Sequence, residues 1–296
     1  MTATAASVEA QAKLNLFLRI LAREQDGHHQ LETLFVRIDL ADSVRVSTDT
    51  SARTLELRGA NVGPPEQNLA WRAADAFAAR ANWPTGFHID IEKRIPVGGG
   101  LGGGSADAGA VLRALNALAP SPLPPADLAS VAFSLGADIP FLATDAPLAL
   151  AWGRGERLLA LRSLPAREVI LCLPPFGVDT ASAYGWLAEE RTRAGAAART
   201  APRALSIDDL DRWDAVSKLA ANDLEAAVES RHPDVARCRE ALETAGARIA
   251  RMSGSGSTAF GVFDRRPPAD FPALPEGTRF VHTRTCTSVA AVRLLD

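Results

Sequence analysis

Apolar and polar residues alternate along the beginning of the chain. Residues 13–20 read KLNLFLRI, where leucine or isoleucine takes every second position and Lys13, Asn15 and Arg19 stand between them. A repeat of two residues is typical of a β-strand, whose successive side chains point to opposite faces. The DGHH turn at residues 26–29 precedes three further segments of strand character, LETLFVRIDL, SVRVSTD and LELRG. This pattern predicts a mostly β-sheet N-terminal region whose first strand carries Lys13 and Asn15 on one face.

Spacings of three and four residues between apolar positions predict helices further along the chain. Residues 67–82, QNLAWRAADAFAARAN, predict an amphipathic helix that stops at WPTG, residues 83–86. Residues 87–95, FHIDIEKRI, return to alternation and predict a strand that ends before a proline. Beyond a run of glycines, Ser105 is a predicted N-cap for a helix that reaches about Ala119. The glycines therefore link a strand to the N-terminus of a helix.

The second half of the chain repeats this mixture of elements. A tight loop, ADIPFLAT, carries Asp138 after a short helix, and VILCLP predicts a buried strand. Helices are predicted near residues 217–229 and 233–245, followed by ARIARMSGSGSTAFGVF, which is typical of strand, glycine loop and strand. The last segment, TSVAAVRLL, predicts one more strand. We expect an α+β fold with two domains, residues 1–163 and 164–296, in which the last strand is free to rejoin the first domain.

Composition narrows the classes of function. The chain has 296 residues, of which 47% are hydrophobic and 23% charged, with a net charge of −3. These values are typical of a soluble globular protein and provide no general attraction to nucleic acid or an anionic membrane. The three cysteines are odd in number and lack a CxxC pair, and no stretch approaches the roughly 18 apolar residues of a membrane span. We therefore expect a cytoplasmic protein whose partners are small molecules.

Lysine is unusually rare in this chain. Lysine and arginine together number 32, yet lysine occurs only at Lys13, Lys93 and Lys218. Lysine offers a compact ammonium group whose pKa moves readily, whereas the guanidinium group of arginine is broad and planar. A site that requires an ammonium group would therefore keep its lysine. We interpret Lys13 in this way, and we interpret Lys93 and Lys218 as chance survivors.

Six of the seven residues from Gly98 to Gly104 are glycine. Backbone N–H groups in such a loop, directly before a helix, form a cradle for phosphate. A Walker loop is excluded because Gly104, and not lysine, precedes Ser105. Gly98, Gly100 and Gly103 match the dinucleotide fingerprint GxGxxG, but no acidic residue follows at a strand end about 20 positions later. We expect a phosphate chain as the ligand, with a dinucleotide site and a flexible hinge as the alternatives.

Three segments resemble the motifs of the GHMP kinase superfamily, which binds ATP without a Walker sequence. AKLNLFL at residues 12–18 resembles its N-terminal motif, PVGGGLGGGSADAG at 96–109 its second motif, and RMSGSGSTAFGVF at 251–263 its C-terminal glycine loop. Through GHHQLETLF, LGADIPF and GRGE, the chain is most similar to the members that phosphorylate 4-diphosphocytidyl-2-C-methylerythritol in the non-mevalonate isoprenoid pathway. The resemblance implies an α+β, two-domain GHMP kinase fold, with a ribosomal-protein-S5-like N-terminal domain and a ferredoxin-like C-terminal domain.

The resemblance also implies roles for individual residues. Lys13 and Asp138 would form the catalytic pair, and Asn68 would lie near the nucleotide base. The residues implied to hold the ATP phosphates are Pro96, Val97, Gly98, Gly99, Gly100, Leu101, Gly102, Gly103, Gly104, Ser105 and Ala106. The residues implied to lie against the cytidine end of the substrate are Asn15, His29 and Phe35. ATP with Mg²⁺ is the implied cosubstrate, and no protein ligand for the metal ion is indicated.

One position departs from the pattern of these members. GHH at residues 27–29 stands where they usually have Gly-Tyr-His. We expect His28 to replace the tyrosine as one wall of the cytosine site, with Tyr184, the single tyrosine of the chain, or Phe35 near the opposite wall. Asp107 lies in the first turn of the helix after the glycines, and we expect it to point away from phosphate rather than to bind metal.

The chemistry of these residue types agrees with phosphoryl transfer. Asp138 can accept the proton of an attacking hydroxyl group, and Lys13 can keep that carboxylate ionised. We therefore predict a kinase that transfers phosphate from ATP to the 2-hydroxyl group of the cytidyl substrate. The alternatives are a GHMP kinase that acts on homoserine, mevalonate or a sugar, and a nucleotide-binding protein that has the fold but no catalytic activity.

Overall fold

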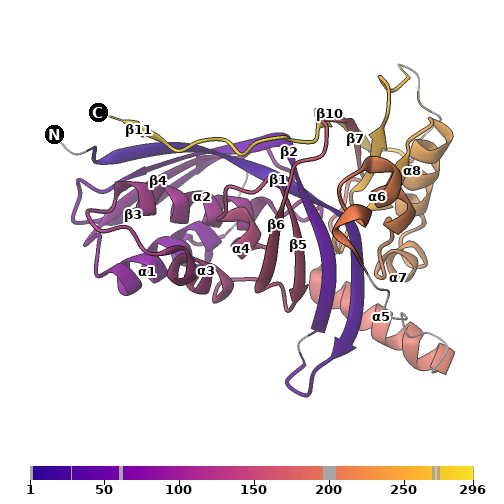
Figure 1. Ribbon diagram of the computed structural model, residues 1–296, viewed down its shortest axis with the longest axis horizontal. Helices are drawn as coiled ribbons and strands as arrows, with labels where there is room; N and C mark the ends of the chain where they lie inside the picture. Colours follow the sequence, from indigo (N-terminus) through magenta and orange to yellow (C-terminus); the bar gives the residue numbers. More distant parts are fainter. Residues whose placement is uncertain are drawn as a thin grey trace.

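The computed structural model describes residues 3–27, 29–59, 63–195, 205–268, 271 and 274–295. Within these residues the chain forms a sheet of seven strands and a sheet of four strands, each with helices beside it (Figure 1). The large sheet contains β1 (Ala5–Arg23), β2 (His29–Ser47), β3 (Arg53–Arg58), β4 (Phe87–Glu92), β5 (Leu148–Gly153), β6 (Arg157–Leu161) and β11 (Arg293–Leu295). The small sheet contains β7 (Glu168–Leu173), β8 (Ile249–Met252), β9 (Ala259–Phe263) and β10 (Arg279–Arg284).

The large sheet is organised around its two longest strands. β1 and β2 have 19 residues each and form an antiparallel pair. β2 pairs with β5 through residues 31–36 and with β4 through residues 43–47, so it joins two halves of the sheet. The prediction of two separate strands over LETLFVRIDL and SVRVSTD was wrong. Most of both segments belongs to the single strand β2, whose pairing with β1 continues through residues 41–47.

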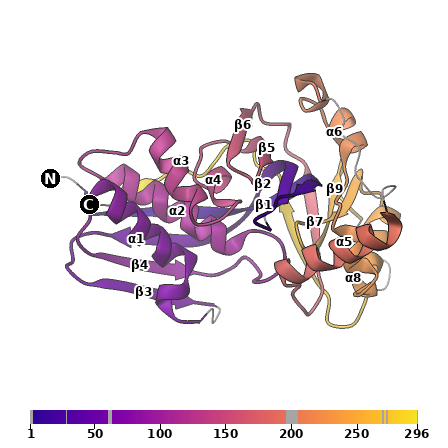
Figure 2. The same ribbon diagram turned by 90° about the horizontal axis from the view of Figure 1, so that it is seen from below.

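The helices form two groups. α1 (Leu69–Ala81), α2 (Gly103–Leu118), α3 (Pro125–Phe133) and α4 (Ile139–Leu142) lie on one side of the large sheet (Figure 2). The part of the chain that carries the small sheet also carries α5 (Thr180–Ala194), α6 (Trp213–Leu219), α7 (Glu225–Glu229) and α8 (Pro233–Thr244). Two short 3₁₀ helices, η1 (Pro65–Gln67) and η3 (Ile207–Asp209), complete the described elements.

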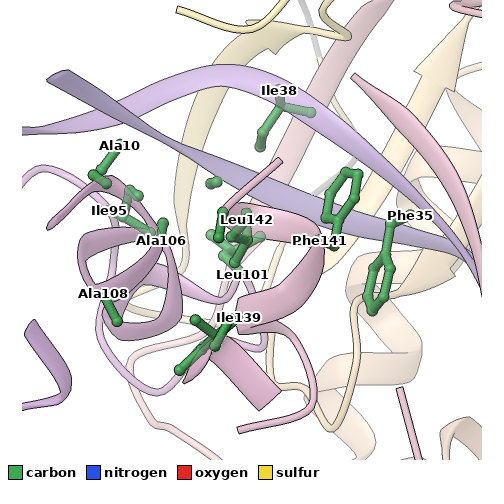
Figure 3. Close-up of a cluster of buried hydrophobic side chains, with 14 of the residues drawn as sticks. Ala10, Phe35, Ile38, Ile95, Leu101, Ala106, Ala108, Ile139, Phe141 and Leu142 are labelled. Carbon is green, nitrogen blue, oxygen red and sulfur yellow. The ribbon is translucent and has the colours of Figure 1, made fainter. Parts of the chain in front are cut away.

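Small residues allow α2 and α4 to pack closely. α2 is buried from Ala106 to Leu115, and its inner face is rich in alanine and glycine. A side chain at Gly109 would place its Cβ 2.5 Å from the carbonyl oxygen of Leu142, so a larger residue would push α4 away. Figure 3 shows Ala106 of α2 and Leu142 of α4 in the same buried cluster. This packing fixes α4 relative to the loop that precedes α2.

Two helix predictions need correction. α2 begins at Gly103, and its N-cap is Gly102, with φ of 72° and no side-chain hydrogen bond. Ser105 therefore lies in the first turn, and its prediction as the N-cap was wrong because the chain enters the helix through a left-handed residue, which favours glycine. The helix predicted over residues 217–229 is interrupted, because Leu18 of β1 exchanges backbone hydrogen bonds with the connection between α6 and α7.

The end of the chain returns to its beginning. β11 pairs with the N-terminal end of β1 and thereby joins the large sheet (Figure 1). The predicted final strand is shorter than expected, and β10, which contains His282, forms an edge of the small sheet. The expected boundary at residue 163 falls between β6 and β7, and we keep residues 1–163 and 164–296 as our proposed domains. In the part of the chain that the structure describes, no helix is both long and apolar enough to span a membrane.

Candidate active site

Most of the residues expected at the site lie around one cleft of about 390 Å³. The cleft is bordered by β1, β2, the glycine run and the residues before α4. The start of α5 and the second glycine loop, residues 253–258, also border it. The expected site residues that line it are Lys13, Asn15, Phe35, Gly98, Gly100, Gly102, Gly103, Gly104, Ser105, Asp138 and Tyr184. The fold thus brings together residues that are more than 150 positions apart in the sequence.

Lys13 is the buried cation of this cleft. Its Nζ donates hydrogen bonds to Asn15 Oδ1 at 2.7 Å and to the carbonyl oxygen of Gly100 at 2.9 Å, and it lies 3.4 Å from Asp138 Oδ2. The side chain of Lys13 is 4% exposed, whereas that of Asp138 is 32% exposed. Two of the three contacts of the ammonium group are therefore to neutral oxygens, and its one carboxylate partner faces the cleft.

The strand that carries Lys13 is irregular at this point. The pairing of β1 with β2 shifts register between Gln11 and Lys13, and again between Asn15 and Phe17. Such bulges re-aim side chains and are common beside active sites. Asn15 Nδ2 donates to Thr33 Oγ1 at 2.8 Å, and this hydrogen bond orients the amide so that its oxygen accepts from Lys13. Between the two shifts the pairing is regular, so Lys13 and Asn15, two positions apart, lie on the same face of β1.

Asp138 is held by the elements around it. It occupies the N-cap position of α4, whose four residues are all buried. Phe141 of α4 stacks on Phe35 of β2, with ring centroids 5.0 Å apart (Figure 3). On the other side, a Cβ at Gly155 in the GRGE turn would lie 2.6 Å from the carbonyl oxygen of Ala137. The close approach of this turn limits the positions open to Asp138.

The glycine run is packed against the second glycine loop, SGSGST at residues 253–258. The carbonyl oxygen of Gly100 accepts from Ser253 Oγ at 2.9 Å. A Cβ at Gly100 would lie 2.1 Å from the carbonyl oxygen of Ser253, and one at Gly99 would lie 2.6 Å from Thr258 Oγ1. Some of the glycines in the run are therefore required because the two loops pack closely against each other. Gly104 differs, because a Cβ there meets only Leu69 Cδ1, at 3.6 Å.

A second hollow, of about 240 Å³, lies along the other side of the glycine run. It is lined by residues 67–69, 93 and 95–104 and by Asp107. Asn68 Oδ1 accepts from the backbone N–H of Ala70 at 2.8 Å, so Asn68 caps α1 while it borders this hollow. Val97, 60% exposed, offers apolar surface beside it. The N-terminus of α2 supplies backbone N–H groups without helix partners, which suits a phosphate chain.

A buried cluster of Lys93, Asp42 and Asp107 lies behind the start of α2. Lys93 Nζ donates to Asp107 Oδ2 at 2.6 Å and also to Asp42. Asp42 Oδ1 accepts from the backbone N–H groups of Arg94 and Ile95, at 2.5 and 2.8 Å. The side chains of Lys93, Asp42 and Asp107 are 5%, 0% and 3% exposed. The interpretation of Lys93 as a chance survivor was wrong, and the rarity of lysine was the signal that pointed to it.

Burial and charge act in opposite directions within this cluster. Burial raises the pKa of Asp107 to about 7, although Lys93 opposes the shift. Burial alone would lower the pKa of Lys93, but Asp107 and Asp42 together raise it above its ordinary value. Lys93 therefore stays charged, and the cluster holds one proton more readily than an exposed pair of carboxylates would.

The expected cytidine end of the cleft contains two rings in contact. Tyr184 of α5 lies against His29 of β2, with centroids 4.5 Å apart. Burial, with a smaller contribution from Asp138, raises the pKa of Tyr184 to about 12, so its hydroxyl group stays protonated at neutral pH. Both rings also border a neighbouring pocket of about 670 Å³. Phe35 is buried and its ring is stacked on Phe141, while His28 lies outside the described residues.

Across the described ranges, no group of three or more histidine, cysteine, aspartate or glutamate side chains is arranged to hold a metal ion. Asp138 faces the cleft and Asp107 is bonded to Lys93, so the two carboxylates near the glycine run are not arranged as a pair. A metal ion that arrives with a nucleotide would therefore depend mainly on phosphate oxygens and water, as Mg²⁺ often does.

Comparison with known proteins gives consistent matches. Residues 68–145 match the family model described as GHMP kinases N terminal domain, and residues 206–271 match GHMP kinases C terminal. The chain is 40% identical over 263 residues to a 4-diphosphocytidyl-2-C-methyl-D-erythritol kinase of Citrifermentans bemidjiense, covering 88% of this chain and 90% of the relative. A crystal structure of 4-(cytidine 5'-diphospho)-2C-methyl-D-erythritol kinase is 32% identical, with a TM-score of 0.71 over 94% of this chain and 98% of that one. A homoserine kinase from Cytophaga hutchinsonii, 15% identical, shares the fold with a TM-score of 0.66 over 99% of this chain and 98% of its own.

Proposed function

Because the chain belongs to the GHMP kinase family, we propose that it transfers the γ-phosphoryl group of ATP to the 2-hydroxyl group of 4-diphosphocytidyl-2-C-methyl-D-erythritol. Relatives that are about 40% identical over most of the chain carry the name of this kinase. The observation that carries the proposal is the pair of Lys13 and Asp138, 3.4 Å apart in a cleft bordered by the glycine run.

In the proposed reaction, ATP lies along the glycine run with its base toward Asn68 and Val97. Backbone N–H groups at the start of α2 bind the phosphate oxygens, and the positive end of the helix dipole favours their charge. The second glycine loop supports the first, since Ser253 and Lys13 both donate to the carbonyl oxygen of Gly100. Mg²⁺, held by the phosphates and water, would offset the negative charge that develops during transfer.

The substrate hydroxyl group would lie between Asp138 and the γ-phosphate. Asp138 accepts the hydroxyl proton as a new bond forms between the hydroxyl oxygen and the γ-phosphorus atom. The bond between that phosphorus atom and the bridging β,γ-oxygen breaks, and ADP leaves with the electron pair. Lys13, 3.4 Å from Asp138, stabilises negative charge on the attacking oxygen.

The cytidyl group would lie at the other end of the cleft. Tyr184 and Asn15 line the cleft there, and Tyr184 is in contact with His29, which borders the neighbouring pocket. Aromatic side chains with a protonated hydroxyl or ring nitrogen can stack on a base and also form hydrogen bonds with it. We keep His28 as a proposed wall of this site on the strength of its position in GHHQLETLF.

An assay of ADP release tests the proposal. ATP is combined in turn with the cytidyl substrate, homoserine and mevalonate, and phosphorus NMR of the product locates the new phosphate. We expect turnover with the cytidyl substrate and a phosphate on its 2-oxygen. Turnover only with homoserine or mevalonate would reject the substrate, and absence of turnover with all three would favour a non-catalytic nucleotide-binding protein. Asp138→Asn in the same assay should lower kcat by at least about 10²-fold.

A further inference from the structure

Arg37 is a buried arginine of β2 that lies close to the candidate catalytic pair. Its side chain is among the largest fully buried ones in the described chain, with 2% of the residue exposed. No carboxylate of the described residues forms an ion pair with it. It donates instead to three carbonyl oxygens, from Nε to Ala146 at 3.2 Å and from Nη2 to Phe141 at 3.0 Å and Thr144 at 2.9 Å. Burial of a guanidinium group that is hydrogen-bonded only to carbonyl oxygens is unfavourable in free energy. We therefore expect Arg37 to have a role at this position.

The three carbonyl groups belong to α4 and the residues that follow it. α4 spans only Ile139–Leu142, and Asp138 is its N-cap. A helix of one turn cannot stabilise itself, and its last carbonyl groups have no helix partners. Arg37 donates to one of these, the carbonyl group of Phe141, which also accepts from the backbone N–H and hydroxyl groups of Thr144. Its guanidinium group places a positive charge at the negative end of the turn. The same guanidinium group lies 5.0 Å from the centre of the Phe141 ring, which is also stacked on Phe35.

The register of β1 and β2 relates Arg37 to Lys13. In the ladder between the two strands, Lys13 is directly opposite Arg37, and Asn15 is opposite Phe35. Residues opposite one another in an antiparallel pair project to the same face. The two cations therefore reach α4 from adjacent strands, Lys13 at Asp138 before the turn and Arg37 at the carbonyl groups after it. Side chains from the same pair of strands therefore contact both ends of the α4 turn.

We propose that Arg37 is a positioning residue for phosphoryl transfer, which binds the C-terminal carbonyl groups of α4 and so fixes Asp138 relative to Lys13. This inference rests on the proposed function, because it gives Asp138 the role of proton acceptor. Loss of Arg37 would allow the α4 turn to shift along β2 while the glycine run, which is bound through Gly100 and Leu101 to the side chain and backbone N–H of Lys13, stays in place. Displacement of a catalytic group by about 1 Å can lower the rate on the order of a hundredfold.

Two variants of Arg37 and one control test this role. Arg37→Met keeps the length of the side chain and removes its donors, and Arg37→Gln keeps one donor group without the charge. Arg113→Met is the control, since Arg113 is also buried but donates to Asp145 and to the carbonyl oxygen of Ala290. For each protein, kcat per folded molecule is measured well below the melting temperature, together with the dissociation constants of ATP and the cytidyl substrate.

We expect Arg37→Met to lower kcat by about ten- to a hundredfold, with ATP affinity within about twofold of the wild type. The kcat of Arg37→Gln should lie between those of the wild type and Arg37→Met. Arg113→Met should lose stability but retain kcat. Wild-type kcat in folded Arg37→Met, or in folded Arg37→Gln if the first variant does not fold, would overturn the proposal. Asp138→Asn separates the two ideas: an active Asp138→Asn enzyme rejects the proposed mechanism, whereas an inactive one beside a fully active Arg37 variant rejects only the positioning role.

Discussion

Two lysines flank the start of α2, and they are used in opposite ways. A Cβ at Gly102 would lie 3.0 Å from Lys13 Cε, and a Cβ at the next residue, Gly103, would lie 3.5 Å from Lys93 Nζ. Among the described residues, Lys13 has a single carboxylate partner, Asp138, at 3.4 Å, which is open to the cleft. Lys93 is bound to two carboxylates, Asp42 and Asp107, and the whole cluster is almost fully buried.

The difference teaches what makes a buried lysine available for chemistry. The charge of Lys93 is already compensated by two carboxylates, and one of these also holds the backbone before the glycine run, so the cluster stabilises the loop. The charge of Lys13 is held mainly by an amide and a carbonyl oxygen, so an attacking oxygen or a phosphate can still interact with it. The two sites share a residue type, and their partners decide their roles.

The largest expected effect is on stability, at Lys93. Lys93→Met should lower the free energy of unfolding by about 3–5 kcal/mol, because Asp42 and Asp107 would remain buried without their cation. Lys13→Met should cost only about 1–2 kcal/mol, since its partners are mostly neutral and Asp138 can be solvated. Urea unfolding at pH 7 measures both values. Equal losses in the two variants would mean that the Lys13 site is as much a part of the folded core as the Lys93 cluster.

The next effect is on activity, at Lys13. Lys13→Arg should lower kcat by at least about 10²-fold, or roughly 2.7 kcal/mol, because a broad planar group does not fit a site shaped for an ammonium group. Lys218→Arg is the matched control, since Lys218 is exposed on α6 and should tolerate the exchange. Steady-state ADP release compares the three proteins. A fully active Lys13→Arg enzyme would show that only positive charge is required at this position.

The glycine run provides an effect of intermediate size. Gly100→Ala should destabilise the protein by about 1–3 kcal/mol, because φ is +76° and the Cβ would overlap the carbonyl oxygen of Ser253. Gly104→Ala should leave stability unchanged or raise it by up to about 1 kcal/mol, since the new Cβ meets only Leu69 within the first turn of α2.

Gly104→Ala should be the more stable of the two glycine variants, but its affinity for ATP should fall. Gly104→Ala should weaken ATP binding by roughly tenfold, or about 1.4 kcal/mol, because the methyl group would occupy the space next to the phosphates. Thermal melts and ATP titrations of the folded proteins test both variants together. Unchanged ATP affinity in Gly104→Ala would mean that the run is shaped by loop packing alone.

A further effect is a pH dependence at the Lys93 cluster. The pKa of Asp107 is raised from 3.8 to about 7 in the folded protein, so the native state holds a proton that the unfolded chain has lost. The contribution of Asp107 to stability is therefore present at low pH and is lost as pH rises through about 7. Its slope should reach at most about 1.4 kcal/mol per pH unit between pH 4 and 7.

Asp107→Asn isolates this dependence from that of other groups. The amide keeps the shape of the side chain but does not titrate, so the difference in unfolding free energy between the two proteins should change steadily from pH 5 to 7. A pH-independent difference for Asp107→Asn would show that Asp107 is ionised throughout.

Local sequence patterns predicted much of the framework. Alternation identified the strands around Lys13 and at residues 87–95, and the spacing of Leu69, Ala73 and Phe77 identified α1, because these patterns depend on the geometry of a single element. The family motifs indicated the candidate site residues. Ser105 was misplaced as an N-cap because φ at Gly102 depends on the contacts of the whole loop.

The sequence by itself determined the element types, the family and the rarity of lysine, all of which are properties of single segments or of composition. Only the tertiary structure decided how those segments meet. It placed Arg37 of β2 on the carbonyl groups of α4, and it joined Asp42 to Lys93 across 51 positions. Such partners cannot be predicted from local sequence patterns. A buried charged side chain must form hydrogen bonds with whichever polar groups the folded chain places next to it.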